Sequence, residues 1–277
     1  FVKMMLLKKK FADYELSGRQ TLIEPEKEDY RTSFSDDTID DFPVTVVLSE
    51  NGWIRSYRGH SLVANSLKFR DGDGVKFIAE LSRSQQLLFI TSKGRSFSLA
   101  LEQIKKDRGY GEPLNLIIGT ESVASIVSVL PFQKEHKGLI FSKNGLGFAV
   151  DFSSLQSSTK AGKQIFELSE GDEVIGLKEI TGDNIIVLSD SFKMLIFSIR
   201  ELPLLKKGKG VRLQRYKAEF LLDVMFFSQN EKNDRVIKKM FPKNEEIGNW
   251  MGKRGQVGKI MPKKLLRKKI TKFKDLL

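Results

Sequence analysis

The chain has 277 residues, of which 40% are hydrophobic, so it can bury the core of one large repeat domain or two ordinary ones. It contains no cysteine, which excludes disulfides and thiolate metal sites, and no apolar run approaches the roughly 18 residues of a membrane span. The formal net charge is +12, and it is unevenly distributed, because residues 1–42 carry 7 basic and 10 acidic side chains while the other 235 residues carry net +15. This basic field favours DNA, RNA or an anionic membrane surface as partner, and a merely soluble basic protein is the alternative.

Residues 1–23 are expected to form the end of a helix that continues from an absent catalytic core. Leu6, Leu7, Phe11 and Leu16 provide its apolar positions, and a helix this short is marginal alone. The chain begins with Phe1 rather than Met, which supports the interpretation as a fragment, and the start lacks the features of a signal peptide. Residues 24–42 are rich in carboxylates with no apolar period, so we expect a solvated acidic linker.

From Pro43 onward the pattern predicts β-hairpins. The run VTVVL (44–48) is followed by SENG and then WIRSY, which is typical of two strands around a glycine-containing turn. The pattern returns at residues 86–100, 138–150 and 184–199. Glycine occupies the first three turn positions and suits a positive φ, whereas Phe192 occupies the fourth, so that turn is expected to differ in conformation or length. The first strand of each hairpin is almost entirely apolar, which predicts burial on both faces.

Two further features repeat with the hairpins. A short loop of glycine and basic residues follows each one, and a fifth copy lies near the end: YRGH (57–60), RGYG (108–111), KAGK (160–163), KKGKG (206–210) and GKRGQVGK (252–259). An apolar strand precedes each later hairpin: 75–81, 123–130 and 173–180, with a fourth at 220–227. The period of about 40–50 residues, with several strands per unit, is typical of propeller blades.

The predicted fold class is therefore all-β. We expect a propeller-like or pinwheel-like domain of about five four-stranded blades over residues 43–277, four of them clear and the fifth degenerate, after the short helix and linker. The abundant phenylalanines are interpreted as core residues rather than base-stacking residues: Phe77, Phe89, Phe97, Phe141, Phe148 and Phe197.

Four motifs, in order, resemble the blades of the C-terminal domain of the bacterial DNA topoisomerase IV A subunit. NGWIRSYRGH (51–60) resembles the first blade and GRSFSLALEQIKKDRGYGEPL (94–114) the second; NGLGFAVDFSSLQSSTKAGKQIFEL (144–168) is similar to the third and ELPLLKKGKGVRL (201–213) to the fourth. The segment 6–24 resembles the end of the coiled helix and linker that follow the family's catalytic core. The related gyrase A subunits carry a QRRGGKG-type box in the first blade, whereas this chain has SYRGHSL (56–62).

The resemblance implies a domain that binds and bends duplex DNA without strong chiral wrapping. It implies a cytoplasmic, nucleoid-associated enzyme of decatenation, relaxation and chromosome segregation, whose partners would be the rest of the A subunit, together with the ATPase B subunit. Magnesium and ATP would be used elsewhere in that holoenzyme, so no cofactor is expected in this chain. The alternatives are a gyrase-type wrapping domain and a basic protein-interaction propeller.

No constellation of catalytic residues is evident. His60 and His136 are far apart in sequence, and the GKG of residues 208–210 lacks the order of a phosphate-binding loop. DGDG (71–74) lacks the later ligands of a calcium loop and is better interpreted as a β-turn. None of the five tyrosines (Tyr14, Tyr30, Tyr57, Tyr110 and Tyr216) lies in the family's nucleophile motif, so the chain is not expected to be an enzyme on its own.

Phosphate binding is the remaining chemistry. Repeated basic loops would place Lys and Arg along one rim, and their glycines let backbone N–H groups approach phosphate oxygens. For each residue the alternative is a solvated surface charge. The expected DNA-binding residues are Arg55, Arg58, Lys93, Arg95, Lys105, Lys106, Arg108, Lys160, Lys163, Lys206, Lys207, Lys209, Arg212, Lys253 and Arg254.

The C-terminal stretch KKLLRKKITKFKDLL (263–277) has an amphipathic helical period. Leu265, Leu266, Ile270 and Phe273 form its apolar face among lysines. We expect this face to pack on the last blade and the lysines to add DNA affinity, with weak contact to an anionic membrane surface as a further possibility.

Overall fold

The computed structural model describes residues 41–60, 67–104, 109–120, 125–228, 235–241 and 244–262, together with Leu265 and Phe273. They belong to one compact unit, Ile39–Leu277. The predicted terminal helix (1–23) and nearly all of the predicted linker (24–42) lie outside the described residues, and the first strand begins at Pro43. Among the helices of the described part, none is long and apolar enough to cross a membrane.

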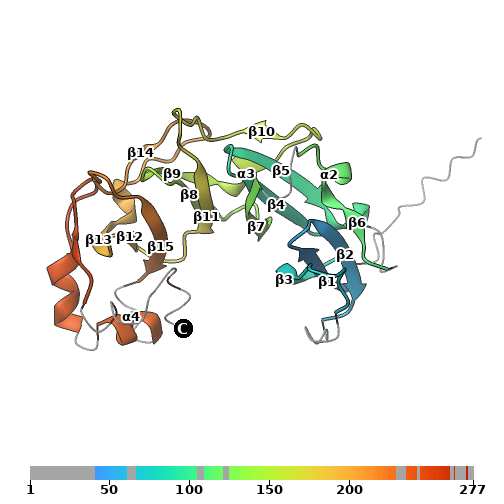
Figure 1. The fold of residues 1–277 in the computed structure, drawn as a ribbon, viewed down its shortest axis with the longest axis horizontal. Helices are drawn as coiled ribbons and strands as arrows, with labels where there is room; N and C mark the ends of the chain where they lie inside the picture. The colour runs from blue at the N-terminus through green and yellow to red at the C-terminus, as the bar shows by residue number, and fades with distance from the viewer. Residues whose placement is uncertain are drawn as a thin grey trace, which may run out of the picture. The chain divides into compact units, whose positions relative to one another are not determined.

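Four antiparallel sheets, each of four strands, make up the described part of the chain (Figure 1). The first, in the order β3-β1-β2-β6, contains β1 (Pro43–Ser49), β2 (Trp53–Arg58), β3 (Val75–Ser82) and β6 (Glu112–Pro113). The second, β10-β5-β4-β7, contains β4 (Gln86–Thr91), β5 (Arg95–Ala100), β7 (Ile126–Pro131) and β10 (Lys163–Gln164). This arrangement confirms the predicted all-β class and the predicted hairpins.

The other two sheets repeat the pattern. The third, β11-β8-β9-β14, contains β8 (Lys137–Ser142), β9 (Leu146–Asp151), β11 (Val174–Glu179) and β14 (Val211–Arg212). The fourth, β15-β12-β13-β16, contains β12 (Asn184–Ser189), β13 (Lys193–Ser198), β15 (Leu221–Phe227) and β16 (Lys259–Ile260). The helices between them are short: η2 (Leu101–Gln103), α2 (Leu114–Ile117), α3 (Phe152–Leu155), η4 (Ile199–Glu201), α4 (Arg235–Met240) and η5 (Asn244–Trp250).

The outer strand of each sheet comes from the repeat that follows it in sequence. β6, β10, β14 and β16 pair with β2, β5, β9 and β13, each at the first two residues after a hairpin turn. Residues 252–259 therefore lead into β16 of the fourth sheet and do not begin a fifth. The expectation of about five blades is corrected to four sheets in the described ranges, because the last basic loop leads into the outer strand of the fourth sheet.

The apolar strand that follows each hairpin returns to that same hairpin. β3 pairs with β1, β7 with β4, β11 with β8 and β15 with β12. The first strand of each hairpin thus lies in the middle of its sheet, between two partners. This position explains the predicted burial of these strands on both faces, and all six residues of β12 are buried.

All four hairpin turns have the same geometry. In three of them the N–H of the turn glycine donates to the carbonyl three residues earlier, over 2.9–3.0 Å, and the Phe192 N–H donates likewise to the Ser189 carbonyl over 2.9 Å. The φ of Phe192 is 60°, in the left-handed region. The expectation of a different fourth turn is therefore wrong. Packing of Phe192 against the core of the fourth sheet, with the Met261 N–H bonded to its carbonyl, stabilises this unfavourable φ.

The core consists of four apolar clusters, and three of them lie between consecutive sheets. The predicted core phenylalanines are buried except for Phe77, which packs partly buried against the first cluster. The fourth cluster joins β12, β13 and β15 to α4, η5 and the C-terminal residues Leu265 and Phe273, which are both buried. Packing of the C-terminal stretch on the last sheet is thus confirmed at these two positions; Leu266 and Ile270 lie outside the described residues.

Candidate nucleic-acid interface

The basic loops lie at equivalent places on successive sheets. Residues 160–162, 206–210 and 252–258 immediately precede β10, β14 and β16, and these strands pair in the same register with the strand after each turn. Each loop therefore lies at the outer edge of a sheet. The first basic motif, YRGH (57–60), instead lies at the end of β2 and does not lead into an outer strand. Its regular spacing in the sequence therefore does not make it structurally equivalent to the other basic loops.

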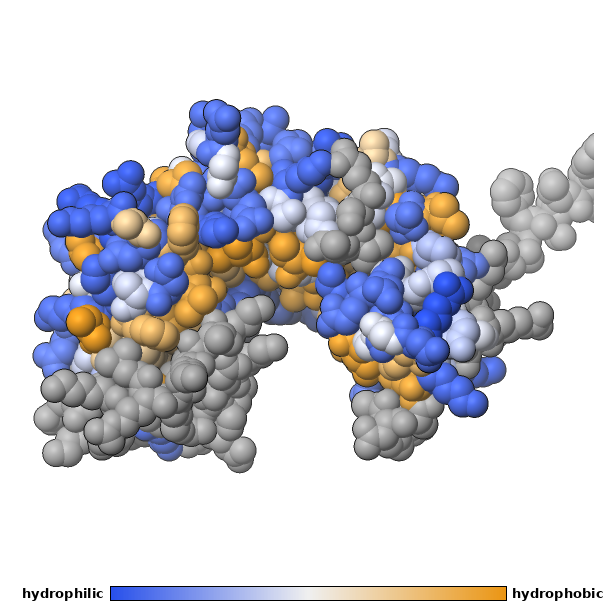
Figure 2. Space-filling view, in the orientation of Figure 1, coloured by the Kyte–Doolittle hydropathy of each residue, from blue (hydrophilic) through white to orange (hydrophobic). Residues whose placement is uncertain are grey.

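Backbone hydrogen bonds connect each basic loop to the segment at the outer edge of the preceding sheet. The Gly119 N–H donates to the Lys160 carbonyl over 2.7 Å, the Glu167 N–H to the Gly208 carbonyl over 2.9 Å, and the Gly255 N–H to the Leu213 carbonyl over 2.9 Å. The loops consequently form a continuous series, which we call the outer edge: residues 109–120, 160–167, 206–215 and 252–260. Figure 2 shows hydrophilic residues gathered over the segments near β10 and β14, with hydrophobic residues over the sheets beneath.

Most of the predicted DNA-binding residues in the described ranges are exposed: Arg58, Lys93, Lys160, Lys163, Lys206, Lys207, Lys209, Arg212 and Lys253. Some of these make local contacts: the Lys163 Nζ donates to the Ser154 carbonyl over 2.8 Å, and the Lys207 Nζ lies 3.2 Å from a Glu167 carboxylate oxygen. The Arg58 guanidinium carbon lies 4.8 Å from the centroid of the Phe42 ring. Lys105, Lys106 and Arg108 lie outside the described residues. The exposed set is a row of positive charge carried largely by the outer edge.

Three predicted arginines hold loops in place. Arg55 is only 3% exposed and donates to the carbonyls of Gly109 and Lys68 over 3.0 and 2.7 Å. It therefore supports the loop instead of facing solvent, and we leave it out of the interface. Arg95 donates to the carbonyl of Ala161 and partly exposed Arg254 to that of Arg212, over 2.6 and 2.8 Å. In each case the arginine side chain donates to a backbone carbonyl of the outer edge.

The structure adds Arg70, which sequence reasoning missed. Its guanidinium carbon lies 3.8 Å from the centroid of the Trp53 ring and 5.4 Å from that of Tyr110, a cation–π arrangement. Tyr110 is 45% exposed at the tip of the RGYG loop. The sequence contained no signal for this cluster, because Arg70 is brought to Trp53 and Tyr110 only by the return of β3 and β6 to the first hairpin.

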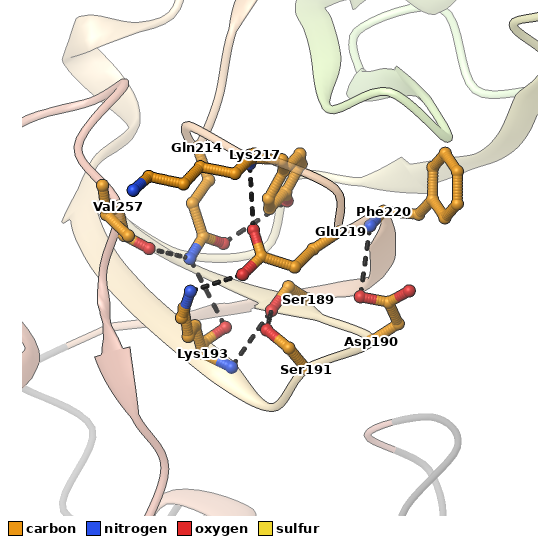
Figure 3. Close-up of polar contacts among 10 residues, drawn as sticks. Ser189, Asp190, Ser191, Lys193, Gln214, Lys217, Glu219, Phe220 and Val257 are labelled. Carbon is orange, nitrogen blue, oxygen red and sulfur yellow. Dashed lines mark hydrogen bonds and ion pairs between the residues drawn. The ribbon is translucent and has the colours of Figure 1, made fainter.

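At the fourth sheet a polar network surrounds the ion pair of Lys193 with Glu219 (Figure 3). Lys193 pairs with Glu219, and its hydrogen bond to that carboxylate lowers the pKa of Glu219. The buried Gln214 side chain donates to the Val257 carbonyl over 2.6 Å and accepts from the Tyr216 hydroxyl over 3.3 Å. Burial, together with nearby Asp190 and Glu219, raises the pKa of Tyr216, which stays neutral. This network anchors the segment between β14 and β15, so we assign it a structural role.

The histidines and the DGDG sequence also have structural roles. The Nε2 of His60 lies within hydrogen-bond distance, 2.9 Å, of the Leu81 carbonyl, and His136 contacts Glu179. Asp73 of DGDG closes a turn and accepts the backbone N–H of Asn51 over 2.9 Å, as the β-turn interpretation predicted. Across the part of the chain that the structure describes, no three His, Cys, Asp or Glu side chains gather as metal ligands would.

Comparison with known proteins defines the class first. The model of the DNA gyrase C-terminal domain, a β-propeller family, matches residues 85–109, 139–180 and 183–228, which lie in the second to fourth sheets. The solved structure of the E. coli ParC C-terminal domain is similar, with a TM-score of 0.70 and 27% identity over 80% of this chain and 95% of that one.

Within this class, the chain belongs to the family of C-terminal domains of topoisomerase IV A subunits. The DNA topoisomerase 4 A subunit of Rickettsia bellii (strain RML369-C) is 34% identical over 220 residues, or 79% of this chain. The corresponding protein of Caulobacter vibrioides (strain ATCC 19089 / CIP 103742 / CB 15) is 34% identical over 223 residues, or 80% of this chain. The chain spans about 30% of the length of these two relatives, 30% and 29% respectively.

Proposed function

We propose that this domain binds duplex DNA along the outer edge without reading its sequence. The observation that carries the proposal is the hydrogen-bonded series of basic loops, repeated in one register from sheet to sheet. Lysine and arginine at such positions neutralise successive phosphates and release counterions. Phosphate contacts of this kind position a duplex but carry no base information.

Bending of the bound duplex follows from the same arrangement. A site of 20–30 bp bent by 40–90° costs on the order of 1–6 kcal/mol, which several charge-assisted phosphate contacts can offset. In a topoisomerase IV holoenzyme, this domain would hold a DNA segment for decatenation and relaxation during chromosome segregation. DNA cleavage, magnesium binding and ATP hydrolysis would occur in the B subunit or the rest of the A subunit, in the bacterial cytoplasm at the nucleoid.

Two alternatives remain distinguishable. A gyrase-type wrapping domain would constrain supercoils of one hand, and the absence of a QRRGGKG-type box from residues 56–62 argues against it. A protein-interaction propeller would use the same basic edge for an acidic partner and would have no duplex affinity at physiological salt. Weak attraction to an anionic membrane surface would be a secondary consequence of the same charge.

The test is a salt series with a duplex of about 40 bp, read by fluorescence anisotropy. If each of four loops neutralises about two phosphates, log K falls against log[salt] with a slope of about −7. Charge reversal of Lys206, Lys207 and Lys209 should weaken binding and flatten the slope. The matched control reverses Lys134, Lys137 and Lys238, three exposed lysines outside the outer edge, and should retain most of the affinity. A wild-type slope shallower than about −3 would contradict the proposal.

A further inference from the structure

The cluster of Trp53, Arg70 and Tyr110, which we call the aromatic stack, belongs to the first sheet alone. The residues that directly precede the positive-φ glycine before each outer strand are Tyr110, Ala161, Lys209 and Val257. The residues that directly follow the positive-φ residue of each hairpin turn are Trp53, Arg95, Leu146 and Lys193. The other three sheets form without an aromatic residue at either position. The fold of a sheet therefore does not require the aromatic stack.

The backbone on both sides of Tyr110 is held against the first sheet. The Arg55 Nη1 donates to the Gly109 carbonyl over 3.0 Å, and β6 begins two residues after Tyr110. Gly111 lies so close to β2 that a Cβ added to it would come within 2.4 Å of the Ile54 carbonyl oxygen. The Tyr110 ring thus projects from a fixed backbone, so a ligand that contacts the ring would not have to order the loop first.

The Tyr110 ring is contacted by a cation and is also open to solvent. The Arg70 guanidinium carbon lies 5.4 Å from the centroid of the Tyr110 ring and 3.8 Å from that of Trp53. Tyr110 nevertheless remains 45% exposed. Because Arg70 lies over one face of the Tyr110 ring, the exposed part of the ring is its other face and its rim. An aromatic face of this kind can stack on another flat ring.

The charges around the aromatic stack suit a neutral ring better than a phosphate. Desolvation opposes ionisation of Asp73, but hydrogen bonds, the first from the Asn51 N–H, and the charge of Arg70 leave the pKa of Asp73 below its usual value. The ionised Asp73 carboxylate offsets part of the Arg70 charge and would repel a phosphate. A nucleobase has no such charge, and every base has a π-face that can stack on an aromatic side chain.

We propose that an unpaired base of single-stranded DNA stacks on Tyr110. The faces of a paired base are covered by its neighbours in the duplex, whereas an unpaired base can turn out onto an aromatic ring. The exposed lysines of the outer edge, such as Lys160 and Lys206, would hold phosphates of the same strand. The inference goes beyond the proposed function, because stacking of an unpaired base does not require that the duplex binds.

The test compares two single-stranded oligonucleotides of about 12 nucleotides, a length within the usual range of single-strand sites. One is oligothymidylate, and the other has stable abasic sugars in place of all its nucleosides. Both carry the same phosphates, so the difference in affinity reports on the bases alone. Fluorescence anisotropy measures both affinities, and that for the duplex of about 40 bp, at low salt.

Three variants are compared with the wild-type chain. Tyr110→Ala removes the ring, and Tyr110→Phe keeps it. Leu116→Ala is the matched control, because it removes another exposed apolar side chain, 71% exposed, from the same segment of the outer edge. The melting temperature of each variant checks that it is folded.

The wild-type chain should bind oligothymidylate more tightly than the abasic chain. Tyr110→Ala should weaken binding of oligothymidylate about tenfold, as loss of one stacked base predicts, and leave the affinities for the abasic chain and the duplex unchanged. Tyr110→Phe and Leu116→Ala should both retain the affinity for oligothymidylate to within about twofold.

NMR spectroscopy gives a second readout, since the chain has only two tryptophans, Trp53 and Trp250. Oligothymidylate should shift the indole N–H signal of Trp53, which shares the Arg70 guanidinium with Tyr110. The signal of Trp250, which packs against the fourth cluster, should not move.

Equal affinity of Tyr110→Ala and the wild-type chain for oligothymidylate, with no shift of the Trp53 signal, would overturn the inference. An equal loss of affinity for the abasic chain or for the duplex would overturn it too, because the ring would then serve phosphates or paired DNA. Failure of the proposed function looks different, since the wild-type chain would not bind the duplex. The two oligonucleotides would still decide whether a base stacks on Tyr110.

Discussion

At the scale of single residues, the turns show how packing and backbone conformation act together. Gly145 has a φ of 78°, and a Cβ added to it would collide with the Tyr216 ring. Gly171 has a similar φ of 75°, but a Cβ there would meet open space. Phe192 shows that a side chain is accepted at the turn position where the neighbouring core gives it contacts. Whether a turn requires glycine therefore depends partly on the φ of that residue and partly on the side chains that a Cβ would contact.

Gly145→Ala is expected to destabilise the domain more than Gly171→Ala. The left-handed conformation costs an alanine roughly 1–2 kcal/mol at either site, and only Gly145→Ala must also displace Tyr216. Urea denaturation of the two variants measures the difference. Equal free energies of unfolding would show that Tyr216 moves without cost.

The Lys193–Glu219 pair makes a prediction about pH. The pKa of Glu219 in the folded chain lies below its ordinary value of 4.5, chiefly because Lys193 hydrogen-bonds to the carboxylate. Such a carboxyl adds stability that is fully present above pH 4.5 and is lost as the pH falls through the lower, folded-state value. Glu219→Gln should therefore lower the melting temperature at neutral pH, and the gap to wild type should narrow below pH 4.5. The exposed Glu135→Gln serves as control, and a gap independent of pH would refute the pair's contribution.

At the scale of elements, the fourth sheet depends on residues that come after it in the chain. Its outer strand β16 comes from residues 259–260, and its far apolar face is covered by α4, η5, Leu265 and Phe273. The buried Asp223 carboxylate links this cover to the sheet, since it accepts the Phe273 N–H over 2.9 Å and pairs with Lys178 over 2.6 Å. The C-terminal residues thus act as the next sheet does in the earlier repeats, by covering an apolar face.

Phe273→Ala is expected to cost about 3–5 kcal/mol of folding free energy, because it leaves a cavity in the fourth cluster. Leu116→Ala, at a side chain that is 71% exposed, should change stability by less than about 0.5 kcal/mol. Guanidinium denaturation followed by Trp250 fluorescence reports on this cluster, against which Trp250 packs. A small effect of the Phe273 substitution would mean that the C-terminal residues contribute little to the cover.

At the scale of the whole molecule, the proposed function concerns the DNA path. The outer edge repeats one arrangement from sheet to sheet, and adjoining loops share backbone hydrogen bonds, so a duplex bound to several loops follows the protein's edge. The positive charge is distributed along this series instead of being concentrated in one patch. Affinity should then depend on how many loops are occupied, and bending on whether neighbouring loops are occupied together.

Circularisation of linear DNA near the persistence length, about 150 bp, measures this bending. The wild-type chain should accelerate ring closure by ligase, and the Lys206/Lys207/Lys209 reversal should reduce the acceleration more than the Lys134/Lys137/Lys238 control. Topoisomers formed by relaxation in the presence of the chain should show little bias of one hand. A strong bias would favour the gyrase-type alternative.

The sequence alone determined the all-β class, the four hairpins, the buried central strands and the repeated basic loops, because alternation, apolar runs and turn residues are local signals. Tertiary structure decided the features that need distant partners. Each outer strand pairs with the preceding sheet, so that the chain forms four sheets in the described ranges instead of the five blades expected. Phe192 adopts a left-handed conformation in the fourth turn. It also decided which basic residues face solvent, since Arg55 is buried and donates to the carbonyls of Gly109 and Lys68, which are distant in sequence. Local periodicity shows which residues are buried and which form turns. Pairing between strands that are distant in sequence determines which loops lie together.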